Sequence, residues 1–119
     1  VVSGVFKTNP SEETGGYLHI EFGACPDNKE LSCGIIKTAI KKDGTTNNSY
    51  ENLGKMMVWN MQDAGSGKFK GGKIWDPSEN NEDGSKKIYN SKMTLTGTTL
   101  RVDGCILFFC KGQDWEKVN

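Results

Sequence analysis

The chain has 119 residues, with 15 Lys and Arg balanced by 15 Asp and Glu, four Cys and a single His. This length fits one domain and excludes two, and an apolar fraction of 34% together with 15 Gly excludes a disordered or collagen-like chain. No apolar run reaches the ~18 residues that cross a bilayer, and zero formal charge gives no general attraction to phosphate backbones. We therefore expect no membrane span and no nucleic-acid partner.

Short alternating segments separated by Gly, Asn and Asp recur along the chain, whereas helical periodicity is almost absent. This pattern predicts an all-β fold. Eight short antiparallel strands either split into two sheets or close on themselves, and closure removes exposed edges. We predict one antiparallel eight-stranded barrel over residues 1–119. The expected strands are residues 4–7, 16–22, 33–41, 55–62, 68–75, 86–95, 98–105 and 110–118, with polar loops at 45–52 and 77–85.

The four cysteines form two close pairs, and each pair brackets a candidate turn. An even number of Cys in a short chain favours disulfides over metal, because structural zinc sites use Cys-x2-Cys spacings or additional His ligands. We predict the bonds Cys25–Cys33 and Cys105–Cys110, with four buried thiols in a reducing cytosol as the alternative. Together with a start at Val1, the disulfides favour an exported protein whose signal peptide has been removed, in a bacterial periplasm or beyond.

The C-terminal third carries two independent signals of strand register. If residues 96–97 form a two-residue turn, Met93 pairs with Leu100. If the second disulfide joins residues that face each other, Leu100 also pairs with Trp115. Both registers place these three side chains in one interior row. The opposite, outer face then carries the charged side chains of Lys92, Arg101 and Asp114.

An eight-stranded barrel leaves an interior that side chains just fill or that holds one small ligand. Large flexible or aromatic side chains on the predicted inner face suit a cavity wall, although they could equally fill the interior. The expected wall residues are Met57, Trp59, Phe69, Tyr89, Met93, Leu100 and Trp115. The side chains that could fix a polar head group are Tyr89, Ser91 and Gln113.

Two consecutive glycines, Gly71 and Gly72, interrupt the fifth expected strand. They predict a bulge or the close approach of a large ring. The pattern leaves open whether Ile74 or Trp75 points into the barrel.

Four consecutive apolar residues stand at the expected tip of the last hairpin, where polar residues are usual. They are Ile106, Leu107, Phe108 and Phe109, and the second cysteine pair pins the base of this hairpin. We interpret them as an entrance lid, or as a surface that meets lipid, a protein partner or a second copy of the chain. The alternative is that the loop folds back and closes one end of the barrel as core.

The single histidine, His19, has Glu21 two residues along the same strand face, close enough for a hydrogen bond. General acid–base catalysis would also need a substrate cleft and a second catalytic group. No Ser or Cys stands at a recognisable spacing from His19, so we expect no enzymatic activity.

Several stretches of sequence occur in the order seen in a known bacterial family, and GGKIWDP at 71–77 is the most specific of them. The others are GVFKT at 4–8, LSCGII at 31–36, YNSKM at 89–93, LRVDG at 100–104 and QDW at 113–115. Over nearly its whole length the chain resembles exported bacterial proteins of the domain of unknown function 2147 family. Members of that family resemble lipocalins, so the resemblance implies a lipocalin-like (calycin) barrel and export but supplies no activity. Phe6 stands where members usually have Trp, and Asp103 interrupts a usual Arg-Gly pair.

Together these features predict an exported barrel that holds a small hydrophobic molecule, such as a fatty acid or similar lipid, without converting it and without a cofactor or metal. The alternative is a periplasmic or secreted interaction module with a filled core. In that alternative, residues 106–109 bind a protein partner or form a weak homodimer.

Overall fold

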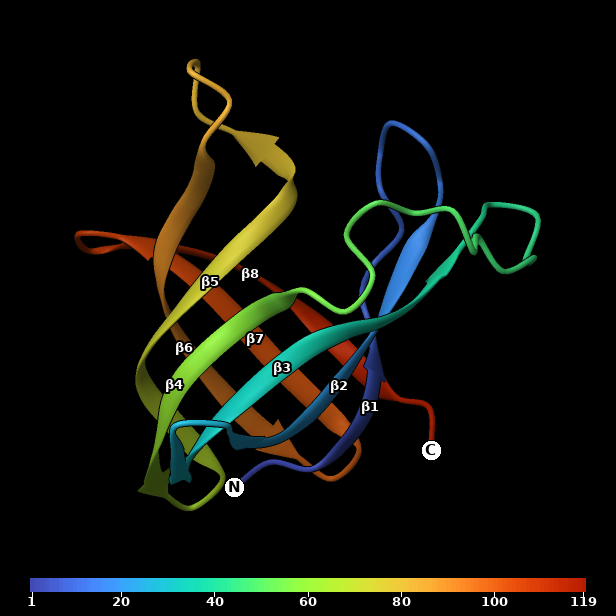
Figure 1. The fold of residues 1–119 in the computed structure, drawn as a ribbon. Helices are drawn as coiled ribbons and strands as arrows, with labels where there is room; N and C mark the ends of the chain where they lie inside the picture. Colours follow the sequence, from blue (N-terminus) through green and yellow to red (C-terminus); the bar gives the residue numbers. More distant parts are fainter.

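The computed structural model describes residues 1–119 and contains eight antiparallel strands that close into one barrel (Figure 1). Each strand pairs with the next along the chain, and β8 returns to β1, so the predicted all-β barrel is confirmed. The strands are β1 Gly4–Lys7, β2 Tyr17–Cys25, β3 Asn28–Ile40, β4 Met56–Gly65, β5 Lys68–Asn80, β6 Lys86–Thr96, β7 Thr99–Ile106 and β8 Phe109–Lys117. The chain has no helix with the length and hydropathy that a membrane-spanning helix requires.

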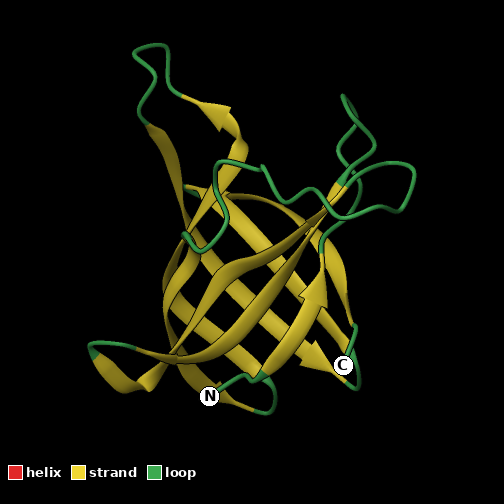
Figure 2. Cartoon of the chain, turned by 45° about the vertical axis from the view of Figure 1, so that its right-hand side comes forward, coloured by secondary structure: helices red, strands yellow, loops and turns green.

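The two ends of the barrel differ in the length of their connections. Short turns join β2 to β3, β4 to β5 and β6 to β7 at one end, where both chain termini also lie (Figures 1 and 2). The longer connections, residues 8–16, 41–55 and 81–85, gather at the other end (Figure 2). We call the first end the closed end and the second the mouth.

Apolar side chains fill the closed-end half of the barrel. The rings of Phe6 and Phe22 meet edge to face at 5.9 Å, and Phe22 lies 6.3 Å from the ring of Trp115. This aromatic stack is surrounded by other buried side chains of the same core cluster, namely Ile20, Ile36, Met61, Phe69, Met93 and Leu100. Phe6, on β1, therefore fills part of the interior.

The last hairpin has the predicted register. Leu100 pairs with Trp115, and Arg101 pairs with Asp114 on the outer face. The guanidinium Nη1 of Arg101 lies 3.5 Å from the Asp114 carboxylate, which is a surface ion pair that marks the register.

The register between β6 and β7 differs from the prediction by two residues. The turn consists of residues 97–98, so Leu95 rather than Met93 lies opposite Leu100. Gly97 has a φ of 62° at the first turn position, where a type II′ turn requires a positive φ and favours glycine. A shift of two residues keeps every side chain on its own face, and Met93 and Leu100 are both buried as predicted.

Both predicted disulfides are confirmed. Cys25 is bonded to Cys33 with their Cα atoms 4.9 Å apart, and Cys105 is bonded to Cys110 with theirs 4.1 Å apart. Such bonds persist in oxidising compartments, so the structure indicates an oxidising, extracytoplasmic environment.

A bulge at the predicted glycine pair shapes the middle of β5. The pairing of β5 with β6 shifts between Phe69 and Gly72, as expected for a β-bulge. A Cβ atom on Gly72 would lie 2.6 Å from the carbonyl oxygen of Trp59 and 2.7 Å from Sδ of Met61. The close approach is therefore to backbone and a Met side chain rather than to a ring.

We expect Gly72→Ala to lower the free energy of unfolding by about 1 to 3 kcal/mol, because the added methyl group overpacks a filled region. Urea denaturation measures this change. Gly23→Ala is the control, since no atom lies within 4 Å of a Cβ at that position and its φ is ordinary. Equal stability of the two variants would contradict the steric role of Gly72.

Candidate ligand-binding site

A cavity of about 1040 Å³ occupies the mouth half of the barrel. Its deep wall is apolar and consists of the buried side chains of Met57, Ile74, Val102 and Trp115. The volume is that of a generous small-molecule site, for which roughly 300 to 1,000 Å³ is usual. The interior thus combines the two predicted possibilities, since side chains fill one half and a cavity occupies the other.

Four of the nine predicted ligand-binding residues line this cavity, namely Met57, Tyr89, Gln113 and Trp115. The predicted wall residues Phe69, Met93 and Leu100 are instead buried in the closed-end half. They lie on the inner face, as expected, but close to the turns at the closed end. Strand alternation identifies the face of a residue and not its depth along the strand, which explains the difference.

The remaining two predicted ligand-binding residues, Ser91 and Trp59, also lie away from the cavity. The hydroxyl of Ser91 donates a 2.7 Å hydrogen bond to the carbonyl oxygen of Asp103 and is therefore already satisfied. Trp59 is half-buried and pairs with Lys73, whose side chain is exposed. Its position opposite an exposed lysine places the ring of Trp59 on the outer side of the sheet.

The structure adds lining residues that the sequence pattern did not identify. Val102 and Gly104 share the inner face of β7 with Leu100 and could have been found by extending the predicted register towards the mouth. The sequence left undecided whether Ile74 or Trp75 on β5 points into the barrel. Both side chains are buried, and Ile74 is the one that lines the cavity. The long connections contribute further lining residues that no periodicity marks, among them Pro10, Glu12, Lys42 and Tyr50.

Gln113 links the deep wall of the cavity to its rim. Its side-chain oxygen accepts hydrogen bonds from the indole Nε1 of Trp115 at 2.8 Å and from the backbone nitrogen of Asn9 at 3.2 Å. These bonds fix the Trp115 ring and the start of the 8–16 connection. The amide nitrogen of Gln113 makes no hydrogen bond to another protein group and is available to a ligand.

Tyr89 reaches the rim and is tied to an acidic side chain. Its hydroxyl donates a 2.6 Å hydrogen bond to Glu79, whose carboxylate also lies 3.9 Å from the ammonium of Lys87. This hydrogen bond raises the pKa of Tyr89 above its ordinary value, and burial raises it further. The phenol is therefore neutral at physiological pH and already engaged.

Charges of both signs surround the mouth, and the cavity has no single electrostatic character. The lysines among the lining residues are Lys41, Lys42 and Lys111, and the acids are Glu12, Glu13, Asp76 and Glu79. No three His, Cys, Asp or Glu side chains lie close enough together to hold a metal ion.

His19 lies on β2 outside the residues that line the cavity. Its ring is 5.9 Å from the ring of Tyr17. The sequence suggested a hydrogen bond between Glu21 and His19, but the Glu21 carboxylate instead pairs with the ammonium of Lys37 at 3.3 Å. Burial lowers the pKa of His19 below its ordinary value, and the charges of Lys7 and Lys37 lower it further.

We expect an NMR titration to give His19 a pKa below its ordinary value of 6.5. Lys37→Gln raises this pKa because it removes a neighbouring positive charge, whereas Lys92→Gln on β6 leaves it unchanged. Because the pKa of His19 is lower in the folded chain than in the unfolded chain, protonation of His19 favours the unfolded chain. The free energy of unfolding therefore falls as the pH drops below about 6.5. A pKa at or above the ordinary value would contradict this environment.

The apolar hairpin tip, residues 106–109, projects from the barrel beside the mouth (left of Figure 1). Relative to full exposure, Ile106 is 56%, Leu107 87%, Phe108 104% and Phe109 72% exposed. The alternative in which this loop folds back to close the barrel is therefore wrong. Ile106 and Phe109 also line the rim of the cavity, which joins the tip to the candidate site.

The turn at this tip places Leu107 in a left-handed conformation, with a φ of 56°. Gly97 takes the same first turn position in the hairpin between β6 and β7, with a φ of 62°. We expect Leu107→Gly to leave the free energy of unfolding unchanged or to raise it by up to about 1 kcal/mol, because backbone strain is relieved and no packing is lost.

The reciprocal variant Gly97→Leu tests the same reasoning. It lowers the free energy of unfolding by about 1 to 2 kcal/mol, since a left-handed conformation is costly for a residue with a Cβ atom. Thermal and urea denaturation of both variants provide the comparison. A large loss of stability in Leu107→Gly would show that the Leu107 side chain packs against the barrel.

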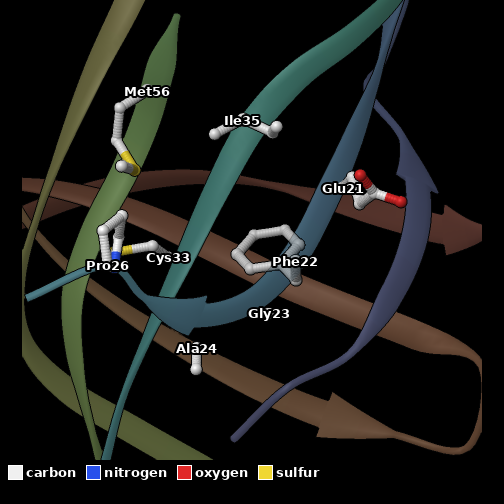
Figure 3. Close-up of a pocket in the computed structure, with 8 residues that line it drawn as sticks. All are labelled: Glu21, Phe22, Gly23, Ala24, Pro26, Cys33, Ile35 and Met56. Atoms are coloured by element: carbon white, nitrogen blue, oxygen red, sulfur yellow. The ribbon is translucent and has the colours of Figure 1, made fainter. Parts of the chain in front are cut away.

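A second, smaller pocket of about 300 Å³ lies on the outer surface of β2, β3 and β4 (Figure 3). Ile35 and Met56 stand side by side on neighbouring strands, with Pro26 and Cys33 at one end of the pocket and Glu21 beyond Ile35 (Figure 3). Eight residues line it, and its volume is at the lower limit for a small-molecule site. The cavity at the mouth is therefore the stronger candidate site.

The fold and the cavity define a closed antiparallel β-barrel with a chamber at one end. Residues 4–117 match the family described as "Uncharacterized protein conserved in bacteria (DUF2147)", and the chain belongs to this family. No curated protein and no solved structure matches the chain.

Proposed function

We propose that the protein binds a small, largely apolar molecule, such as a fatty acid or similar lipid, in the cavity and releases it unchanged. The observation that carries this proposal is the cavity of about 1040 Å³, whose deep wall is formed by buried apolar side chains while its rim is polar. Such a division of surface matches a ligand with an apolar body and a polar end.

A comparison of free energies indicates that tight binding needs both the apolar wall and the polar rim of the cavity. Burial of ten methylene groups gains roughly 8 kcal/mol, at about 0.8 kcal/mol each. Association costs at least about 4 kcal/mol in lost translational and rotational freedom. The remainder corresponds to millimolar binding, so polar contacts at the rim supply the further affinity that a micromolar site requires.

The polar end of the ligand has a suitable position on β8. Lys111 and Gln113 both line the cavity and, being two residues apart, lie on the same face of the strand. An ammonium group and a free amide nitrogen there can donate hydrogen bonds to a carboxylate. Tyr89 is less suitable because its hydroxyl is bonded to Glu79.

The lipocalin-like assignment and export form part of the same proposal. Consecutive strands pair around the whole barrel, which is the up-and-down arrangement that lipocalins use for ligand binding. The two disulfides support a location in the periplasm or outside the cell. A binding role without catalysis accords with the position of His19 outside the cavity lining.

A variant that fills the cavity tests the proposal. Gly104 lines the cavity, and a Cβ there would lie 3.4 Å from Ile74 and 3.5 Å from Tyr89, which ordinary packing tolerates. We expect Gly104→Leu to weaken binding of dansyl-undecanoic acid at least 10-fold in a fluorescence titration, because the larger side chain extends into the chamber.

Gly23→Leu is the matched control, since it adds the same side chain at the outer pocket, where a Cβ meets no atom within 4 Å. It should bind the probe as the unmodified protein does. Loss of binding in Gly23→Leu alone would assign the probe to the outer pocket, and absence of binding by the unmodified protein would refute the proposed function.

A further inference from the structure

The exposed apolar side chains of this protein are concentrated at one corner of the mouth. Seven large hydrophobic side chains are exposed, and five of them, Ile88 and residues 106–109, belong to the three neighbouring strands β6, β7 and β8 and the turn between β7 and β8. The other two, Val1 and Val118, lie at the chain ends at the closed end. Scattered single apolar residues are normal on a surface, whereas a cluster of this kind marks an interaction site.

The hairpin tip can enter an apolar medium without burying a carboxylate. Between Gly104 and Gly112, the only charged residue is Lys111. The nearest acids on the hairpin, Asp103 and Asp114, are both paired with Arg101, at 3.3 and 3.5 Å. Insertion of the tip therefore desolvates no unpaired negative charge.

An apolar side chain stands at the first position of the tip turn, where the backbone conformation favours glycine. Leu107 occupies a left-handed position that glycine fills in the neighbouring hairpin, and it is 87% exposed, so it does not contribute to the core. Backbone strain of this kind is retained where the residue has a function. The tip thus combines an unfavourable turn residue with apolar side chains that nothing in the chain covers.

We propose that residues 106–109 insert into the boundary between headgroups and acyl chains of a lipid bilayer and hold the cavity mouth against it. The tip is convex, and a lipid surface accepts a convex apolar loop without shape complementarity. Protein interfaces of standard size use roughly 20 to 30 residues on each side, many more than this corner offers.

Docking in this position has a consequence for the candidate ligand. Ile106 and Phe109 belong both to the tip and to the cavity rim, so a bilayer that receives the tip touches the entrance of the cavity. An apolar ligand then passes between bilayer and cavity without crossing bulk water. This transfer role rests on the proposed function, whereas docking itself does not.

Binding to vesicles tests the docking. Flotation with vesicles of palmitoyl-oleoyl phosphatidylethanolamine and phosphatidylglycerol, and with pure palmitoyl-oleoyl phosphatidylcholine, should recover the unmodified protein in both cases, because apolar insertion drives binding. We expect the double variant Leu107→Ser, Phe108→Ser to lower the partition coefficient at least 10-fold. The matched control Val1→Ser, Val118→Ser removes two exposed apolar side chains at the closed end and should leave it unchanged.

A second measurement reports the position of the tip directly. In the variant Phe108→Trp, the emission of the added tryptophan should move to shorter wavelength when vesicles are present, and acyl-brominated lipids should quench it. Equal partition of the unmodified protein and the double Ser variant, or an unchanged emission of Phe108→Trp, would overturn the proposal. Unchanged melting temperatures verify that the variants fold.

Sedimentation and ligand extraction distinguish membrane docking from dimer formation and from ligand binding. If sedimentation shows a dimer that the double Ser variant dissociates, and vesicles do not bind, the tip is an interface between copies and the proposal is wrong. Gly104→Leu should bind vesicles normally yet fail to extract dansyl-undecanoic acid from them. If the unmodified protein docks and binds dansyl-undecanoic acid in solution but fails to extract it from vesicles, the transfer role is wrong while docking and ligand binding stand; if it docks but does not bind the acid in solution, the proposed function is wrong and docking stands.

Discussion

The aromatic contact between Phe22 and Trp115 decides what the inside of this barrel can do. On the closed-end side of this contact, Phe6 and Phe22 pack edge to face and side chains fill the interior. On the mouth side, Trp115 forms part of the deep wall of the cavity, and Gln113 accepts a hydrogen bond from its indole. A barrel of eight strands has just enough room for side chains or for one small ligand, and this stack divides that room between the two.

The architecture was accessible from the sequence because its signals are local. Alternation gave eight strands, and the spacing of the cysteines gave both disulfides and the pairing of Leu100 with Trp115. The turn at Gly97 allowed two positions two residues apart, and both keep the same faces, so the pattern alone could not choose between them. The exposed position of residues 106–109 was equally undetermined, since a continuous apolar run has no period that distinguishes core from surface.

The candidate site was accessible only in part, because depth and loop position are properties of the assembled barrel. Phe69, Met93 and Leu100 have the expected face but lie near the closed end, while Tyr89 and Gln113 lie near the mouth. Whether an inward-facing residue reaches the cavity depends on whether it lies on the closed-end side or the mouth side of the Phe22–Trp115 contact, and strand alternation does not report this position. The connection at 41–55 carries no strand periodicity, yet it brings Tyr50 to the rim.

The two ends of the chain are joined by hydrogen bonds at the closed end. The backbone nitrogen of Val118 donates to the carbonyl oxygen of Val5 at 2.8 Å, and the backbone nitrogen of Val5 donates to the side chain of Asn119 at 2.7 Å. A short linker between the termini therefore adds little loop-closure entropy. Circular permutation with new ends in the 41–55 connection would preserve every strand pair and place both new ends at the mouth of the barrel.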